Sequence, residues 1–458
     1  MDASNQSMAS AEISCPSTAA MPVAAPSLRT TFAWVLAGNV IYALCQWGMI
    51  SVLAKRGTSA AVGQFALALA ITAPLFMLTN LFLRGIQATD ARSDFAFANY
   101  FTLRAVGTSL GLLIVGVILL ANRHNSGAWG VVMFVAAAKA VESFTDVIAG
   151  LLQKHDRLDQ VAISMMLKGG FSVIAFSAAY LRWHSVVAAS AALCLTWLAV
   201  FLGYDLRVAR KLLGNESYLA WDRTVLLKLA KLAAPVGIVM ALISLNGNVP
   251  RYAVERYRGS SELGIFAALA YLVVVVSLIV NALGQSAIVR LSRSFAAGDT
   301  RHFANLLKRM SLVGIGLSGM GMVLASVFGR TVLRLLYGPE YAAHLGLLLI
   351  LVATSGVTAV ASFLGCGMSA ARRFREQLPV TAVTVITCAT AAYLLTPRWG
   401  LTGAAIAILL SGVAQVAGSL IVLAKAIRMM NAKGLPPEPL RQMDAIETLA
   451  VMSGVTNE

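Results

Sequence analysis

The chain has 458 residues, of which 58% are hydrophobic and only 12% are charged, and its formal net charge is +16. A soluble domain has about 45–50% apolar and about 25% charged residues, so this composition excludes a soluble globular protein. The five cysteines are scattered through the chain, which excludes a disulfide-rich scaffold. We therefore predict a polytopic membrane protein.

The predicted elements begin after residues 1–29, which lack the pattern of a cleavable signal peptide and are expected to form a disordered cytoplasmic tail. A helix needs about 20 apolar residues to cross a bilayer. Ten segments run for seventeen or more residues without Asp, Glu, Lys or Arg, and two others are interrupted by charges. Such segments are too long for barrel strands, so we predict an all-α integral membrane protein with twelve transmembrane helices. The predicted spans are 30–54, 57–83, 105–121, 128–152, 160–181, 185–204, 232–250, 263–289, 310–329, 346–371, 377–397 and 399–424.

Two repeated patterns divide these spans into two groups of six. Residues 59–66 (SAAVGQFA) are similar to residues 260–267 (SSELGIFA), each after the first span of its group. An Arg-Trp pair precedes the last span of each group, at 182–183 and at 398–399. The repeats predict two six-helix lobes, related as parallel repeats with the substrate path between them.

The expected N-lobe covers residues 30–204 and the expected C-lobe covers residues 232–424. The basic linker, 205–231, is expected to form an amphipathic helix on the cytoplasmic surface, and residues 425–458 a cytoplasmic tail. Of the 36 Lys and Arg residues, 25 fall on the side of the N-terminus and ten on the other side. This asymmetry predicts that both termini are cytoplasmic. The excess of basic residues then lies in cytoplasmic loops beside anionic lipid headgroups. We therefore expect no binding to nucleic acid.

Span 128–152 carries Lys139, Glu142 and Asp146 at helical spacing, so all three lie on one face. Lys139 can pair with Glu142, which leaves Asp146 as a candidate for ion coupling or gating. The alternative is a charge cluster that locks this span to a neighbour. Arg104 and Lys168, near predicted cytoplasmic helix ends, are expected to extend to the headgroups.

Span 232–250 and the residues after it carry a second polar stripe, formed by Ser244, Asn248, Arg251 and Glu255 at steps of three and four. The Arg251 guanidinium is a fixed cation with five donors and suits a phosphate. We therefore assign the stripe to a substrate path. The alternative is that Arg251 and Glu255 form a salt bridge at the membrane boundary.

Two weaker stripes lie on the first and eighth spans. The first comprises Asn39, Tyr42 and Gln46, and the second includes Asn281 and Gln285. We include them in the candidate substrate path, although amide side chains also commonly join helices within a membrane.

Signals of enzymatic chemistry are missing from the sequence. It has no Walker A pattern, no H-E-x-x-H and no G-x-S-x-G motif, and its five histidines lie at or near loops without metal-ligand spacing. We expect no catalytic residues, no cofactor and no metal site.

Six segments of the second half carry a resemblance to a known family. They are NVPRY (248–252), GIFAALAY (264–271), NALGQS (281–286), RLSRSFAAGD (290–299), YGPEY (337–341) and GLTGAA (400–405). Together with the twelve-span layout over roughly residues 30–425, these segments resemble bacterial polysaccharide-biosynthesis flippases, the Wzx-type O-antigen and exopolysaccharide transporters. That family belongs to the multidrug/oligosaccharidyl-lipid/polysaccharide exporter superfamily.

The resemblance implies two lobes around a central V-shaped lumen and alternating access. It implies a polyprenyl-diphosphate-linked glycan as substrate, moved from the cytoplasmic to the outer leaflet of the inner membrane. Membrane lipids and a polymerase or other polysaccharide-assembly proteins would be its partners. On this picture Arg251 is the first candidate to contact the diphosphate.

Three other classes of protein remain as alternatives to this expectation. A small-molecule or multidrug cation antiporter of the same superfamily would share the fold, but the basic candidate residues argue against a cationic substrate. A membrane glycosyltransferase or polymerase would need acidic catalytic residues on a sizeable external loop, and a non-transporting scaffold would not need the polar stripes.

Overall fold

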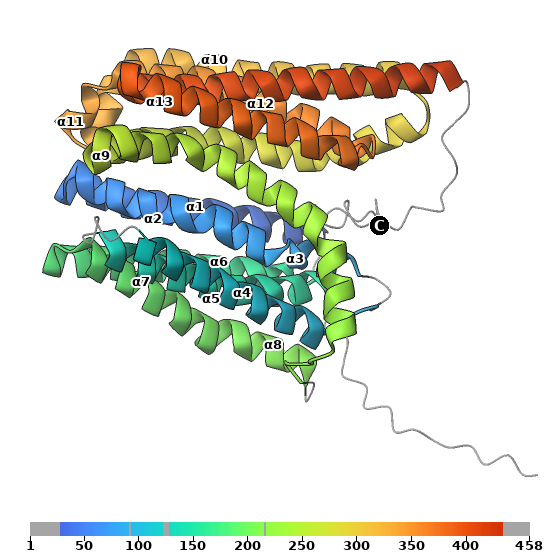
Figure 1. Ribbon diagram of the computed structural model, residues 1–458, viewed down its shortest axis with the longest axis horizontal. Coiled ribbons are helices and arrows are strands. Elements are labelled where there is room, and N and C mark those ends of the chain that lie inside the picture. Colours follow the sequence, from blue (N-terminus) through green and yellow to red (C-terminus); the bar gives the residue numbers. More distant parts are fainter. Residues whose placement is uncertain (1–27, 91–92, 122–127, 215–216, 434–458) are drawn as a thin grey trace, which may run out of the picture.

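The computed structural model describes residues 28–90, 93–121, 128–214 and 217–433. Within these ranges the regular secondary structure is entirely helical (Figure 1). The expected N-terminal tail lies outside the described residues except for its last two, which begin the first helix. The expected C-terminal tail starts as helix, because the last helix continues to Lys433, and the rest of it lies outside the described residues.

The helices of the first half, residues 28–213, contain the first six predicted spans. They are α1 (Leu28–Arg56), α2 (Ser59–Asn80), α3 (Leu83–Thr89), α4 (Phe97–Ala121), α5 (Trp129–Lys154), α6 (Leu158–Trp183), α7 (Val186–Val200), the π-helical turn η2 (Phe201–Asp205) and α8 (Leu206–Leu213). The last three form one continuous rod, since no loop separates them.

The second half, residues 223–433, contains the other six predicted spans. Its helices are α9 (Arg223–Ala296), α10 (Thr300–Leu336), α11 (Pro339–Ala342), α12 (Leu345–Ala370) and α13 (Phe374–Lys433). The long helices α9 and α13 each hold two predicted spans. Each is broken at a glycine with positive φ, Gly259 (φ 82°) and Gly400 (φ 58°), a conformation that costs glycine little.

The all-helical membrane fold class is confirmed, whereas the number of separate spans stays a prediction. In the described part of the chain, nine helices are long and apolar enough to cross a membrane. Two of these nine are α9 and α13, with their internal breaks. The charged helix α5, which holds the fourth predicted span, is not among the nine.

The predicted linker, 205–231, is not a single helix. Helix α8 ends at Gly214, which has a positive φ of 59°, and a non-helical segment precedes α9. Asp222 caps α9 by accepting hydrogen bonds from the backbone N–H groups of Thr224 and Val225. The helical expectation therefore holds only for the two ends of the linker.

The two halves meet mainly where α2 packs along α9, whereas α1 contacts α9 much less. In Figure 1 most of the second half (lime to red) lies above the first half (blue to green), but the start of α9 descends beside the first half, where it shares a buried apolar cluster with α3 and α4. One end of the molecule carries α11. We call this the α11 end and the opposite one the α8 end. The main cluster of buried apolar side chains joins Val62 and Phe65 of α2 to Leu263 and Phe266 of α9, so the apolar junction lies toward the α11 end.

Candidate functional site

The two halves touch most closely through two equivalent glycines. A Cβ atom built on Gly63 of α2 would overlap the carbonyl oxygen of Ser260, and one built on Gly264 of α9 would overlap the carbonyl oxygen of Ser59. These residues hold matching positions in the repeated segments 59–66 and 260–267. The repeat therefore marks the place where the two halves pack backbone to backbone.

Polar contacts between the halves surround this glycine pair. The Ser59 hydroxyl donates to Glu340 Oε1 at 2.8 Å, and the Ser59 and Ser261 hydroxyl oxygens lie 2.5 Å apart. The Trp47 indole N–H donates to the Tyr337 hydroxyl oxygen at 2.8 Å. Burial raises the pKa of Tyr337, so this hydroxyl stays neutral. Together these contacts close the α11 end.

Arg251 lies half-buried on α9 without a carboxylate partner. Its Nη1 donates to Asn248 Oδ1 at 2.9 Å, and Asn248 Nδ2 donates to the Ser244 carbonyl at 2.8 Å. No ion pair in the described part of the chain includes Arg251. Glu255 instead accepts a hydrogen bond from the Ser260 hydroxyl at 2.8 Å. The alternative of an Arg251–Glu255 salt bridge is therefore wrong.

Candidate residues from three predicted stripes converge near Arg251. Tyr42 and Gln46 lie one turn apart on α1, and Tyr42 is an electrostatic neighbour of Glu142 of α5. Tyr271, which follows the break in α9, is an electrostatic neighbour of both Tyr42 and Arg251. Tyr271 had no place in the predicted stripes, yet it links the α1 stripe of one half to the arginine of the other.

The pairing of Lys139 with Glu142 is confirmed. Lys139 Nζ lies 2.6 Å from Glu142 Oε2, and the same ammonium group stands 5.7 Å from the centre of the Trp197 ring. The cation is therefore held by a carboxylate and by an aromatic face. Because Glu142 is an electrostatic neighbour of Tyr42, we assign this pair to the same group as the α1 stripe.

Asp146 is not the leftover carboxylate that the sequence predicted. Its Oδ2 accepts from Arg104 Nη2 at 2.9 Å, and its Oδ1 lies 3.6 Å from Arg84 Nη1. The expectation that Arg104 extends to the headgroups is also wrong, because its side chain is fully buried. The guanidinium is turned inward because Asp146 compensates its charge there. This geometry matches the alternative interpretation, in which the charge cluster fixes α5 to α3 and α4.

Lys168 likewise points into the protein rather than to the headgroups. Its Nζ lies 2.8 Å from Asp205 Oδ2 and 2.5 Å from the Thr145 hydroxyl. Asp205 also accepts from Thr145 at 2.9 Å and from Ser164 at 2.6 Å. Asp205 was not among the predicted site residues, because the sequence analysis placed it at the start of the linker and not inside a span. A lone lysine in an apolar span was the available signal, since a buried cation requires an acidic partner.

The remaining predicted residues lie apart from the Tyr42–Arg251 group. Asn39 is exposed and donates to the carbonyl of Val35 in its own helix at 2.8 Å. Asn281 and Gln285 are exposed, and they lie about 15 and 21 Å farther along α9 than Tyr271 at 1.5 Å per residue. Among the described residues, no three His, Cys, Asp or Glu side chains are placed to hold a metal ion.

The chain is similar to known proteins both in sequence and in fold. No family model matches the chain. The capsular polysaccharide biosynthesis protein CapF of Staphylococcus aureus is 26% identical over 385 residues, which cover 83% of this chain and 95% of CapF.

Two solved structures share the fold. An inward-facing multidrug resistance MATE family transporter of the MOP superfamily has a TM-score of 0.69 at 12% identity, covering 87% of this chain and 98% of its own. The lipid II flippase MurJ, in an inward closed conformation, has a TM-score of 0.69 at 10% identity, covering 92% of this chain and 97% of its own.

Proposed function

Because the chain has the fold of MOP-superfamily transporters and is related to a capsular polysaccharide biosynthesis protein, we propose that it is a flippase for lipid-linked glycans. The substrate is a polyprenyl-diphosphate-linked oligosaccharide repeat unit. It moves from the cytoplasmic to the outer leaflet of a bacterial inner membrane, for O-antigen or exopolysaccharide assembly. Both termini face the cytoplasm, as the distribution of Lys and Arg predicts.

The observation that carries this proposal is the unpaired guanidinium of Arg251. A half-buried cation without a carboxylate is costly, and an anionic substrate would supply the missing charge. A guanidinium can bind a phosphate through two parallel hydrogen bonds, so a diphosphate suits it. The hydroxyl of the next residue, Tyr252, donates to the Ala70 carbonyl of α2, so Arg251 stands beside the junction of the two halves.

The position of the contacts between the halves supports alternating access. In the predicted orientation the α11 end faces away from the cytoplasm, and there the glycine pair and the Ser59–Glu340 hydrogen bond hold the halves together. Among the solved neighbours, an inward-facing MATE family transporter has a TM-score of 0.69 with this chain, against 0.55 for an outward-facing one. We therefore interpret this structure as the inward state, with Tyr42 and Gln46 available to sugar hydroxyls near Arg251.

The test compares two substitutions on one helix in a strain that lacks the chromosomal gene. Arg251→Gln removes the unpaired cation, and Arg256→Gln removes an exposed cation five residues along. The measurements are the leaflet that holds the lipid-linked repeat units and the amount of surface polysaccharide. Losing a charge-assisted contact of about 1.5–3 kcal/mol should lower export at least about tenfold for Arg251→Gln. The Arg256→Gln protein should export like the wild type.

Two outcomes would contradict the proposal. Normal export by the Arg251→Gln protein, at normal abundance, would remove the arginine from the substrate path. Normal surface glycan in the deletion strain, together with increased sensitivity to cationic drugs, would replace the flippase by the cation antiporter.

A further inference from the structure

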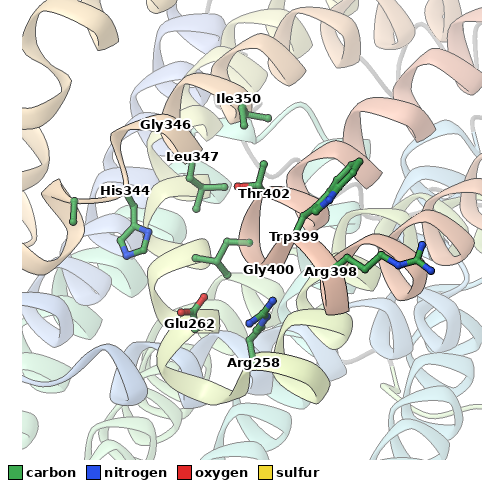
Figure 2. Close-up of a pocket in the computed structure, with 12 residues that line it drawn as sticks. Arg258, Glu262, His344, Gly346, Leu347, Ile350, Arg398, Trp399, Gly400 and Thr402 are labelled. Carbon is green, nitrogen blue, oxygen red and sulfur yellow. The ribbon is translucent and has the colours of Figure 1, made fainter.

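A second group of charged and aromatic side chains lies around a cavity of about 550 Å³ at the α11 end of the second half (Figure 2). Three chain segments form this cavity: the break of α9 at Gly259, the start of α12, and the break of α13 at Gly400. All its lining residues belong to the second half. The cavity is therefore separate from the Tyr42–Arg251 group, in which both halves take part.

The cation of this cavity is Arg258. Its Nη2 donates to the Pro397 carbonyl at 3.2 Å, and its guanidinium lies against Gly400, 3.5 Å from the place of a Cβ there. These contacts hold the side chain and use one of its five donors. Arg258 takes part in no ion pair within the described residues. In Figure 2 the Arg398 side chain is directed away from the other lining residues, so Arg258 supplies the positive charge.

The other lining groups are not those of a site built for phosphate alone. Glu262 is a hydrogen-bond acceptor that suits a hydroxyl, while His344 and Thr402 offer further polar atoms. Trp399 also lines the cavity, and 55% of its side chain is not covered by protein. An aromatic face with nearby donors and acceptors suits a sugar ring, whose faces are apolar and whose edges carry hydroxyls.

We propose that this cavity binds an acidic sugar residue of the exported glycan. The sugar ring stacks on Trp399, its carboxylate binds the free donors of Arg258, and Glu262 accepts from a hydroxyl. The cavity volume lies within the range of about 300–1,000 Å³ that small-molecule sites have. The class of cargo rests on the proposed flippase function.

Arg258 also continues the stripe of Arg251 along α9. The two arginines are seven residues apart, which places them two turns and about 10.5 Å apart on the same face of the helix. In the predicted orientation Arg258 lies nearer the extracytoplasmic side. The cavity would therefore receive an acidic part of the glycan on the exit side of the diphosphate site.

The experiment uses the purified full-length protein in phosphatidylcholine nanodiscs and measures the binding of trigalacturonic acid, with maltotriose as the neutral probe. The variants are Trp399→Ala and Arg258→Gln. The matched control is Trp183→Ala, at the equivalent Arg-Trp pair of the first half; Trp183 is 64% exposed and does not line the cavity. We expect Trp399→Ala to weaken binding of the acidic probe at least about tenfold, because it removes the aromatic ring on which the sugar stacks.

Arg258→Gln should remove the preference for the acidic probe over the neutral one, and Trp183→Ala should change neither. If Arg258→Gln does not fold, because it loses the contact with Pro397, Trp399→Ala decides alone. Equal binding by the wild-type and Trp399→Ala proteins overturns the proposal, as does an absence of binding to the wild type.

A phospholipid is the other occupant that the experiment tests. In nanodiscs that also contain phosphatidylglycerol, native mass spectrometry would then show this lipid bound to the wild type and lost in Trp399→Ala. That result, with no binding of trigalacturonic acid, would also overturn the proposal. The binding measurement needs no transport, so its failure is distinguishable from a failure of the flippase function, which the Arg251→Gln export assay decides.

Discussion

The two halves of the molecule differ in how their partly buried charges are compensated. In the first half, each of three buried or half-buried carboxylates has a basic partner on the same or a neighbouring helix. The three pairs are Lys139–Glu142, Arg104–Asp146 and Lys168–Asp205. In the second half, Arg373 pairs with Glu376 at the start of α13, but Arg251 has only the amide of Asn248.

This difference separates charges that hold helices together from a charge that remains available. The interior of a membrane bundle gains little from apolar contact between helices, so hydrogen bonds and close packing join them. In the first half, the Arg104–Asp146 and Lys168–Asp205 pairs join helices. In the second half, hydroxyls do so, such as Ser318 donating to the Val352 carbonyl at 2.6 Å. Removing a charge should therefore affect stability in one half and transport in the other.

The largest effect is expected for Asp205→Asn. The substitution leaves Lys168 buried without a carboxylate and weakens the hydrogen bonds from Thr145 and Ser164. Breaking a buried pair typically costs about 3–5 kcal/mol. Thermal unfolding of the purified protein should show this loss. The double variant Lys168→Met, Asp205→Asn should recover much of it, and equal instability of the two variants would contradict the role of the pair.

A smaller loss is expected for Asp146→Asn, which leaves Arg104 buried without a carboxylate, whereas the Arg84 side chain is 36% exposed. Because the Asp146 side chain is 31% exposed, we expect about 2–3 kcal/mol, less than for a fully buried pair. Unfolding and transport should fall together. If transport is lost while the free energy of unfolding is unchanged, Asp146 is a coupling residue after all.

The substitutions Gly63→Ala and Gly264→Ala should each lower stability by a smaller amount, and by the same amount as one another. A methyl group on Gly63 or on Gly264 must displace the facing backbone, at about 1–3 kcal/mol for overpacking. The α11 end should open, which lowers the yield of a disulfide between Ser59→Cys and Ser261→Cys. Gly116→Ala is the control, since nothing lies within 4 Å of a Cβ there. Unequal effects of the two glycine variants would contradict the equivalence of the repeats.

The smallest effect on stability is expected for Arg251→Gln. Removing an unpaired, half-buried cation relieves its desolvation, so the free energy of unfolding should stay within about 1 kcal/mol of the wild type or rise. Arg104→Gln, measured in the same way, should be clearly destabilising. Equal destabilisation by the two substitutions would mean that Arg251 is a structural residue and would remove the contrast between the halves.

The sequence was sufficient to predict the long helices and one of the ion pairs. Long apolar runs define helices by themselves, and Lys139 and Glu142 lie three residues apart on one helix, so their contact follows from helical geometry. The equivalence of Gly63 and Gly264 was also visible as a repeat.

The contacts between helices could not be predicted in the same way. Whether Arg104 reaches Asp146 or the headgroups depends on the rotation and depth of α4 against α5, which a single sequence does not contain. The same holds for Lys168 and Asp205, and for Tyr271, an uncharged residue within an apolar run. The two chain reversals at Gly259 and Gly400 are so short that the helices on either side run together, which a count of spans does not reveal.

The glycine contact has the geometry of a two-fold interface within one chain. As in a symmetric dimer, each partner offers the same patch, so the contact of Gly63 with Ser260 is repeated by Gly264 with Ser59. A rotation of one half against the other about this point must break both copies at once, because neither can part while the other stays closed. The α11 end should therefore open in a single cooperative step rather than unzip from one side.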